Sequence, residues 1–315
     1  MRVAAIDCGT NSIRLLIADI ADDDGVTRLS EVVREMRVVR LGQGVDATGR
    51  LAPKALERTF AAIDEYAGMI RAADAEAVRF VATSATRDAS NRQDFVDGVR
   101  ARLGIDPEVA TGEEEAALSF AGAVSVLPPA DGERVLVVDL GGGSTEFVLG
   151  SGTGVEAALS VDMGCVRFTE RFLHGDPPSE AEVAAAEAEV ERTLDAVARV
   201  VPLRDADRVI GVAGTITTIT AHALDLDSYQ PDQIDGTGLP VRVVEAAAAE
   251  LLAFTRDRRG ALPFMHPGRV DVIGAGALIW RAILRRLESE TDGRIRTAVA
   301  SEHDILDGIA LGLAT

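Results

Sequence analysis

The sequence predicts an α/β protein made of two domains with related architecture. Strand-like and helix-like segments alternate along most of the 315 residues. A turn-rich break at residues 128–132 separates two such blocks. The pattern that opens the chain also returns after this break, displaced by 132 positions. We therefore expect domains at 1–128 and 133–315, with the last helix packing back toward the first domain.

The first block opens with two strands joined by a tight turn. Apolar residues predict strands at 3–6 and 13–20, with the turn at 7–12 between them. An acidic turn at 22–25 leads to a third strand-like stretch through Leu41. The expected elements that follow are a helix from Pro53, a buried strand at 78–82, a helix around Phe95 and Val99, a short strand near Val109, and a helix from Glu113 to about Val126.

The second block repeats the opening pattern and then continues with its own helices. The matching positions are Val3 and Val135, Asp7 and Asp139, Gly9 and Gly141, and Ser12 and Ser144. In both copies an apolar strand leads to an aspartate, a glycine-bearing turn and a further strand, the second of these at 145–149. Four matches in one register indicate a duplicated domain. The later elements are expected at 179–201 (helix), 209–213 (strand), 241–255 and 274–287 (helices), 297–299 (strand), and from Asp304 (helix).

Charge and composition narrow the range of partners. The chain has 32 basic and 51 acidic residues, a net charge of −19, which argues against a protein that coats nucleic acid or an anionic membrane. There is no uncharged apolar run of about 18 residues and no signal-peptide pattern at the start. Two cysteines, Cys8 and Cys165, make no disulfide framework, so we expect a reducing, cytoplasmic location.

Two glycine-bearing turns, each led by an aspartate, are the candidate phosphate loops. Glycines let the backbone approach a phosphate closely, and successive N–H groups and hydroxyls can surround an anion. Asp7 and Asp139 would then hold a divalent cation beside the phosphate. An ordinary hairpin is the competing interpretation for either turn taken alone, but the pair in register favours two loops facing each other across a cleft.

Several motifs together resemble the exopolyphosphatase/guanosine-pentaphosphatase (Ppx/GppA) family. They are DCGTNS (7–12), LGQGVD (41–46), ATSATR (82–87), TGEEEA (111–116), VDLGGGSTE (138–146) and GVAGT (211–215). This family belongs to the superfamily of acetate kinase, sugar kinases, heat-shock chaperone ATPases and actin. The resemblance implies two actin-like (ribonuclease H-like) α/β domains, with mixed β-sheets flanked by helices and an active-site cleft between them.

The resemblance also implies a role for individual residues. Glu115 matches the base that activates the attacking water, whereas taken alone residues 113–115 are acids that favour a helix start. The implied phosphate-binding residues are Thr10, Asn11, Ser12, Arg87, Gly141, Gly142, Gly143, Ser144, Gly214 and Thr215. The expected metal ligands are Asp7, Asp139 and Glu146, holding Mg²⁺ or, as the second choice, Mn²⁺. Without the resemblance, Arg87 is predicted to be a solvated surface residue. Residues 211–215 are then predicted to allow close packing between a helix and a strand.

Three features bear on these expectations. Leu306 stands where the family often has an arginine, which puts a cationic role there in doubt. The chain resembles the short, two-domain members, without the helical extension that helps long members bind long polymers. Arg269 and Asp271 match a family Arg-x-Asp element, and a structural ion pair is the alternative interpretation. Cys165 is predicted to be a buried apolar residue rather than a nucleophile.

The sequence therefore predicts an exopolyphosphatase that releases terminal orthophosphate from inorganic polyphosphate by metal-assisted attack of water. Hydrolysis of guanosine pentaphosphate is the competing prediction within the same chemistry. Two further hypotheses are a kinase of the superfamily and a non-catalytic sensor of a phosphorylated alarmone. The resemblance also implies a homodimer.

Overall fold

The computed structural model describes residues 1–23 and 26–314, which form two compact units. Unit 1 consists of Met1–Gly122 and Ile305–Thr315, and unit 2 of Ala123–Asp304. The chain therefore divides earlier than the expected turn at 128–132, which lies in unit 2. The last helix belongs to unit 1 because its apolar side chains complete the core of that unit.

Unit 1 contains one five-stranded mixed sheet. Its strands are β1 (Arg2–Cys8), β2 (Ser12–Asp23), β3 (Val26–Val38), β4 (Ala77–Ala82) and β5 (Glu108–Val109), in the order β3-β2-β1-β4-β5. Its helices are α1 (Val45–Thr48), α2 (Pro53–Ala72), α3 (Ser84–Asp88), α4 (Arg92–Leu103) and α13 (Ile305–Leu311), together with the first part of α5 (Gly112–Val126), whose residues 123–126 belong to unit 2. β1 is antiparallel to β2 and parallel to β4.

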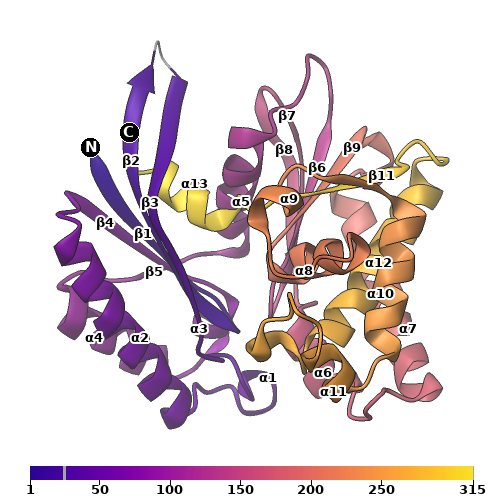
Figure 1. Ribbon diagram of the computed structural model, residues 1–315, viewed down its shortest axis with the longest axis horizontal. Helices are drawn as coiled ribbons and strands as arrows, with labels where there is room; N and C mark the ends of the chain where they lie inside the picture. Colours follow the sequence, from indigo (N-terminus) through magenta and orange to yellow (C-terminus); the bar gives the residue numbers. More distant parts are fainter. Residues whose placement is uncertain (24–25, 315) are drawn as a thin grey trace. The chain divides into compact units, whose positions relative to one another are not determined.

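The two faces of this sheet carry separate apolar cores. Ala4 and Ile6 of β1 point to the core shared with α2 and α4, whereas Val3 and Ala5 point to the core shared with α13. Helices consequently cover both faces of the sheet (Figure 1). Leu306 is 1% exposed in the α13 core, so this position takes an apolar side chain and has no cationic role.

Unit 2 contains a six-stranded mixed sheet in the order β10-β11-β9-β6-β7-β8. Its strands are β6 (Val135–Leu140), β7 (Thr145–Ser151), β8 (Gly154–Val161), β9 (Arg208–Val212), β10 (Gly238–Pro240) and β11 (Thr297–Ala300). Its helices are α6 (Cys165–Phe172), α7 (Glu180–Val200), α8 (Gly214–Ala223), α9 (Pro231–Ile234), α10 (Val241–Ala253), α11 (Arg256–Gly260) and α12 (Ile273–Glu290), with 3₁₀ turns at Leu203–Asp205 and Pro267–Arg269. The fully buried Trp280 of α12 lies in its core.

The internal repeat seen in the sequence is also a repeat of topology. The run β3-β2-β1-β4 in unit 1 corresponds to β8-β7-β6-β9 in unit 2, with the same parallel and antiparallel pairings. Even the irregularities coincide: a register shift falls between Ile17 and Ala18 in one copy and between Leu149 and Gly150 in the other. Both positions differ by the same 132 residues. Because bulges are specific features of a strand pair, their coincidence supports duplication.

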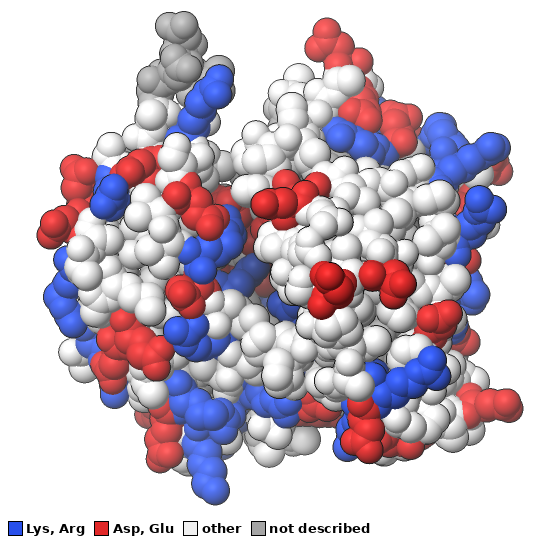
Figure 2. Space-filling model, viewed as in Figure 1, with Lys and Arg blue, Asp and Glu red and all other residues white. Residues whose placement is uncertain are grey.

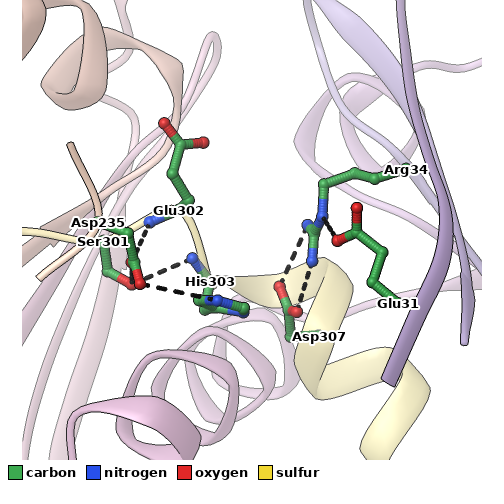
Figure 3. A network of polar contacts seen from close by, with 7 residues as sticks. All are labelled: Glu31, Arg34, Asp235, Ser301, Glu302, His303 and Asp307. Carbon is green, nitrogen blue, oxygen red and sulfur yellow. Dashed lines mark hydrogen bonds and ion pairs between the residues drawn. The ribbon is translucent and has the colours of Figure 1, made fainter. Parts of the chain in front are cut away.

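Polar contacts fix the last segment of the chain at two places (Figure 3). In unit 1, Asp307 of α13 accepts a hydrogen bond of 2.7 Å from Arg34 of β3, which also pairs with Glu31. In unit 2, Asp235 accepts hydrogen bonds from the Ser301 hydroxyl and the Glu302 N–H group, at 3.0 and 2.9 Å.

Most expected elements are present, and the differences have local causes. The third strand ends at Val38 rather than near Leu41, because residues 39–42 turn to bind the loop that follows β1. Arg40 adopts a positive φ of 51° in this turn. The expected turn at 22–25 includes residues 24 and 25, which lie outside the described residues.

Candidate active site

Two hairpin turns, which we call loop 1 (residues 9–12) and loop 2 (residues 141–144), follow the first strand of each unit. Each is closed by the same hydrogen bond. The N–H group of Gly9 donates to the carbonyl of Ser12 at 2.9 Å, and that of Gly141 to the carbonyl of Ser144 at 3.1 Å. The two loops are therefore closed in the same way at equivalent positions.

The backbone of loop 1 has its carbonyl groups turned to one side. The carbonyl of Thr10 accepts from the N–H of Gly42 at 2.8 Å, and that of Asn11 accepts from the N–H groups of Val39 and Arg40 at 3.0 and 2.8 Å. In a planar trans peptide the N–H of the next residue points opposite to the carbonyl. Two successive N–H groups are thereby directed away from residues 39–42, as in an anion-binding nest.

Loop 2 is held in the same way by the start of α6. The carbonyl oxygens of Gly141, Gly142 and Gly143 accept from the Cys165 N–H at 3.0 Å, the Val166 N–H at 2.9 Å and the Arg167 Nε at 2.8 Å, respectively. The contact is so close that a Cβ on Gly164 would lie 2.3 Å from the Gly142 carbonyl oxygen. Three successive N–H groups of loop 2 therefore point away from α6 and can receive phosphate oxygens.

The residue paired across the hairpin with the aspartate before each loop differs between the two units. Asp7 pairs in register with Arg14, whose Nη2 lies 2.7 Å from its carboxylate. At the equivalent position of unit 2, Asp139 pairs in register with Glu146. In unit 1 the aspartate thus faces a cation, whereas in unit 2 two buried carboxylates lie opposite each other.

This pair of carboxylates fits the expected metal. Asp139 and Glu146 are 6% and 1% exposed, and Glu146 accepts a hydrogen bond of 2.6 Å from Ser160. Carboxylate oxygens are the ligands that Mg²⁺ prefers, with water and substrate phosphates completing the shell. Within the described residues there is no group of three or more His, Cys, Asp or Glu side chains that could hold a metal ion. Such a site would therefore depend on water and on the substrate.

The three acids that begin α5 have different environments. Glu114 accepts hydrogen bonds from the N–H and hydroxyl of Thr111, and the Glu114 N–H donates back to that hydroxyl. This reciprocal pair is a capping box, and it lowers the pKa of Glu114. Glu113 is exposed, but Glu115 is 7% exposed. Of the three, only Glu115 therefore has the protected position that a catalytic base needs.

Arg87 of α3 lies beside Glu115. Its Nη1 donates to the Glu115 carboxylate at 3.1 Å and to the Ala110 carbonyl at 2.9 Å. Both contacts are made by Nη1, so the Nε and Nη2 groups of the guanidinium can donate to a phosphate. Loop 1 reaches the same helix, because the Thr10 hydroxyl is hydrogen-bonded to Ser84 at 2.9 Å.

The start of α8 contains the last two predicted phosphate-binding residues, Gly214 and Thr215. The preceding Ala213 has φ 73° and ψ 166°, a conformation that is costly for any residue except glycine and that is often found at functional sites. A Cβ on Gly214 would lie 2.1 Å from Nη2 of Arg269, so glycine is needed for the guanidinium to lie against the turn. Thr215 contacts the Cys165 thiol. Burial raises the pKa of this thiol to about 11, so Cys165 has the character of a buried residue rather than of a nucleophile.

Sequence reasoning missed the basic residues that organise these loops. Arg14 contacts the carboxylate of Asp7, and Arg167 contacts a carbonyl of loop 2. For Arg14 the available signal was its spacing of seven residues from Asp7, because a tight hairpin places these two positions opposite each other. Arg167 reaches loop 2 from a separate helix, α6.

Duplicated α/β units, each with a hairpin whose N–H groups could bind an anion, and a buried glutamate beside an arginine are the features expected of a phosphate-processing enzyme. The comparison with known proteins agrees: the model of the Ppx/GppA phosphatase family matches residues 16–312, and the chain belongs to that family. This confirms the family predicted from the motifs.

Similar proteins cover the whole chain. Exopolyphosphatase 2 of Mycobacterium tuberculosis is 50% identical over 318 residues, covering 99% of this chain and 98% of that protein. The solved Ppx/GppA enzyme of Aquifex aeolicus is 32% identical, with a TM-score of 0.80 and 99% coverage of both chains. An exopolyphosphatase structure from Cytophaga hutchinsonii is 25% identical, with a TM-score of 0.87 over 99% of this chain and 97% of that one. The predicted fold class is confirmed by these structures.

Proposed function

We propose that this protein is an exopolyphosphatase that releases terminal orthophosphate from inorganic polyphosphate. Membership of the Ppx/GppA phosphatase family and 50% identity to a protein named exopolyphosphatase 2 support this substrate. The observation that carries the mechanism is the burial of Glu115, next to two exposed acids that only begin a helix, and its hydrogen bond to Arg87.

In this mechanism the N–H groups of loop 1 and those of loop 2 are the proposed phosphate donors of their respective units. Glu115 accepts a proton from the attacking water, and Arg87 keeps that carboxylate oriented while its remaining N–H groups bind a phosphate oxygen. Phosphoryl transfer needs little covalent chemistry from the protein, so positioning and charge stabilisation supply most of the rate. Gly214 and Thr215 would bind phosphate from the start of α8.

We place Mg²⁺, or Mn²⁺ as the second choice, at Asp139 and Glu146. When bound, the metal would neutralise charge on the phosphate oxygens. The two opposed, buried carboxylates support this site, because carboxylate oxygens are the ligands that Mg²⁺ prefers. Asp7 is the third expected ligand, and within unit 1 it forms an ion pair with Arg14.

A phosphate-release assay on the purified protein tests the function. The substrates are polyphosphate of several lengths, guanosine pentaphosphate, and ATP with an acceptor sugar. Release from polyphosphate at the highest kcat/KM supports the proposal. Preference for guanosine pentaphosphate would support that substrate instead, phosphate transfer to the sugar would indicate a kinase, and tight binding without turnover would indicate a sensor.

The homodimer and the cytoplasmic location stay predictions. No helix among the described residues is both long and apolar enough to cross a bilayer. Light scattering on the purified protein tests the homodimer, and fractionation of the source cells tests the location.

A further inference from the structure

Basic side chains gather at the lower edge of unit 1 in Figure 2. Residues 39–58 contain four basic and two acidic residues, although the whole chain has 32 basic and 51 acidic ones. This segment joins β3 to the first turns of α2. The local charge balance is therefore opposite to that of the protein.

Four cations of this region have no ion-pair partner in the part of the chain that the structure describes. Arg50, Lys54, Arg58 and Arg92 are all exposed, and none of them makes an ion pair with any residue that the structure describes. Arginines elsewhere in unit 1 are commonly paired, as in Arg2 with Asp19. With acids in excess across the chain, a group of four basic residues that lack acidic partners needs an explanation.

Hydrogen bonds connect the group to loop 1. The Nε of Arg58 donates to the Val39 carbonyl at 2.9 Å, and the Val39 N–H donates to the Asn11 carbonyl in loop 1 at 3.0 Å. Lys54 lies four residues before Arg58 on the same face of α2, about 6 Å along its axis. The cations therefore begin beside loop 1 and continue away from it along α2.

The remaining two cations extend the row past the start of α2. The side chain of Asn91 donates to the Leu51 carbonyl at 3.1 Å and accepts from its N–H at 2.8 Å. This pairing brings Arg92 next to the segment that holds Arg50.

The placement of Lys54 is also unfavourable for the helix itself. It lies in the first turn of α2, where no acidic residue occurs and no side chain caps the helix. A cation near a helix N-terminus opposes the helix dipole. A residue that destabilises its own helix, with no nearby contact that offsets the cost, is a candidate for a functional role.

We propose that Arg58, Lys54, Arg50 and Arg92, which we call the basic row, bind the part of a polyphosphate chain that extends beyond its terminal phosphates. The inference rests on the proposed function and names how that site holds its polymer. Each phosphate of the chain carries negative charge, so a row of unpaired cations increases affinity only for substrates long enough to reach it. Because the row is short, the gain reaches a limit at medium chain length.

The test compares a Lys54→Gln, Arg58→Gln double variant with the wild-type enzyme on tripolyphosphate, a medium chain and a long chain. Exposed ion pairs are individually weak, so we expect KM for the medium chain to rise about three- to tenfold. The rise should be smallest with tripolyphosphate, kcat should change little, and high salt should reduce the difference. Lys54→Gln alone shows the same trend without disturbing the hydrogen bond of Arg58 to Val39.

Arg71→Gln is the matched control. Arg71 is exposed and lacks an ion pair with any described residue, but it lies in the last turn of α2, about 25 Å from Lys54 along the helix. An equal rise in KM at every chain length, an equal rise in the control, or no rise would overturn the inference. Calorimetric binding of the medium chain to the same variants decides it independently of turnover. If the wild-type enzyme releases no phosphate from any polyphosphate, the proposed function fails instead.

Discussion

Replacing Glu115 with glutamine keeps the shape of the side chain and one hydrogen-bond acceptor but removes the base. General-base assistance typically contributes about 10²–10⁴-fold to the rate. We therefore expect kcat to fall by that factor, which corresponds to about 3–5 kcal/mol of lost transition-state stabilisation. Substrate Kd should change little, because binding is assigned to the loops, Arg87 and the metal.

The structure also sets the expected cost in stability. Glutamine can still accept from Nη1 of Arg87, which lies 3.1 Å from Glu115, but the hydrogen bond loses its charge on one side. A charge-assisted hydrogen bond exceeds a neutral one by about 1 kcal/mol, and part of that is screened because a quarter of Arg87 is exposed. The melting temperature should fall by no more than about 2–4 °C.

Glu113→Gln and Glu114→Gln are internal controls on the same helix turn. Glutamine can replace glutamate in the capping box with Thr111, and Glu113 is exposed, so both variants should keep near-normal turnover. Measurements of kcat, Kd and thermal melts on the three variants are sufficient. Normal turnover in Glu115→Gln with a loss in a neighbour would move the base to that neighbour. Normal turnover in all three would refute the mechanism.

Three further predictions test the metal, the substrate and the stability of unit 2. Glu146→Gln should raise the Mg²⁺ concentration needed for half-maximal activity, and excess chelator should stop the wild-type enzyme; activity that persists in chelator would exclude the metal role. Short or medium polyphosphate should be preferred over very long chains, because the basic row is short; activity per chain end that climbs steeply with length would contradict this preference. Hydrogen bonds from Ser179, His174 and Gly175 lower the pKa of Glu182 to about 2 from 4.5. Its charged form therefore stabilises the fold above about pH 4.5, and this contribution disappears as the pH falls toward 2. Urea unfolding of wild type and Glu182→Gln should accordingly differ at neutral pH and converge near pH 2, and a constant difference would contradict the assignment.

The sequence was sufficient for the hairpins because their signals are local. An apolar strand, an aspartate and a glycine-bearing turn occur within a few residues, and their repetition after 132 positions identifies both copies. The burial of Glu115 beside two exposed acids could be anticipated only through the family resemblance. Helix periodicity does not distinguish it from Glu113 and Glu114, which occupy the same turn.

The rest depends on contacts between distant parts of the chain. The apolar pattern of α13 predicts a helix, but Ile305 and Leu306 give no indication of which sheet they cover. Arg167 likewise reaches loop 2 from a helix that begins more than twenty residues later. The strained conformation of Ala213 has no sequence signature, because alanine is common in ordinary turns.

Unit 2 is one uninterrupted stretch of chain, Ala123–Asp304, whereas unit 1 is assembled from two segments. In topological terms, unit 2 is an insertion into unit 1. A fragment containing only unit 2 retains its complete core, but one containing only the first segment of unit 1 lacks the helix that covers one face of its sheet. Proteolysis just before Ile305 would therefore destabilise unit 1, although the cut directly follows unit 2 in the sequence. Adding residues 305–315 as a separate peptide is then the way to restore the core of unit 1.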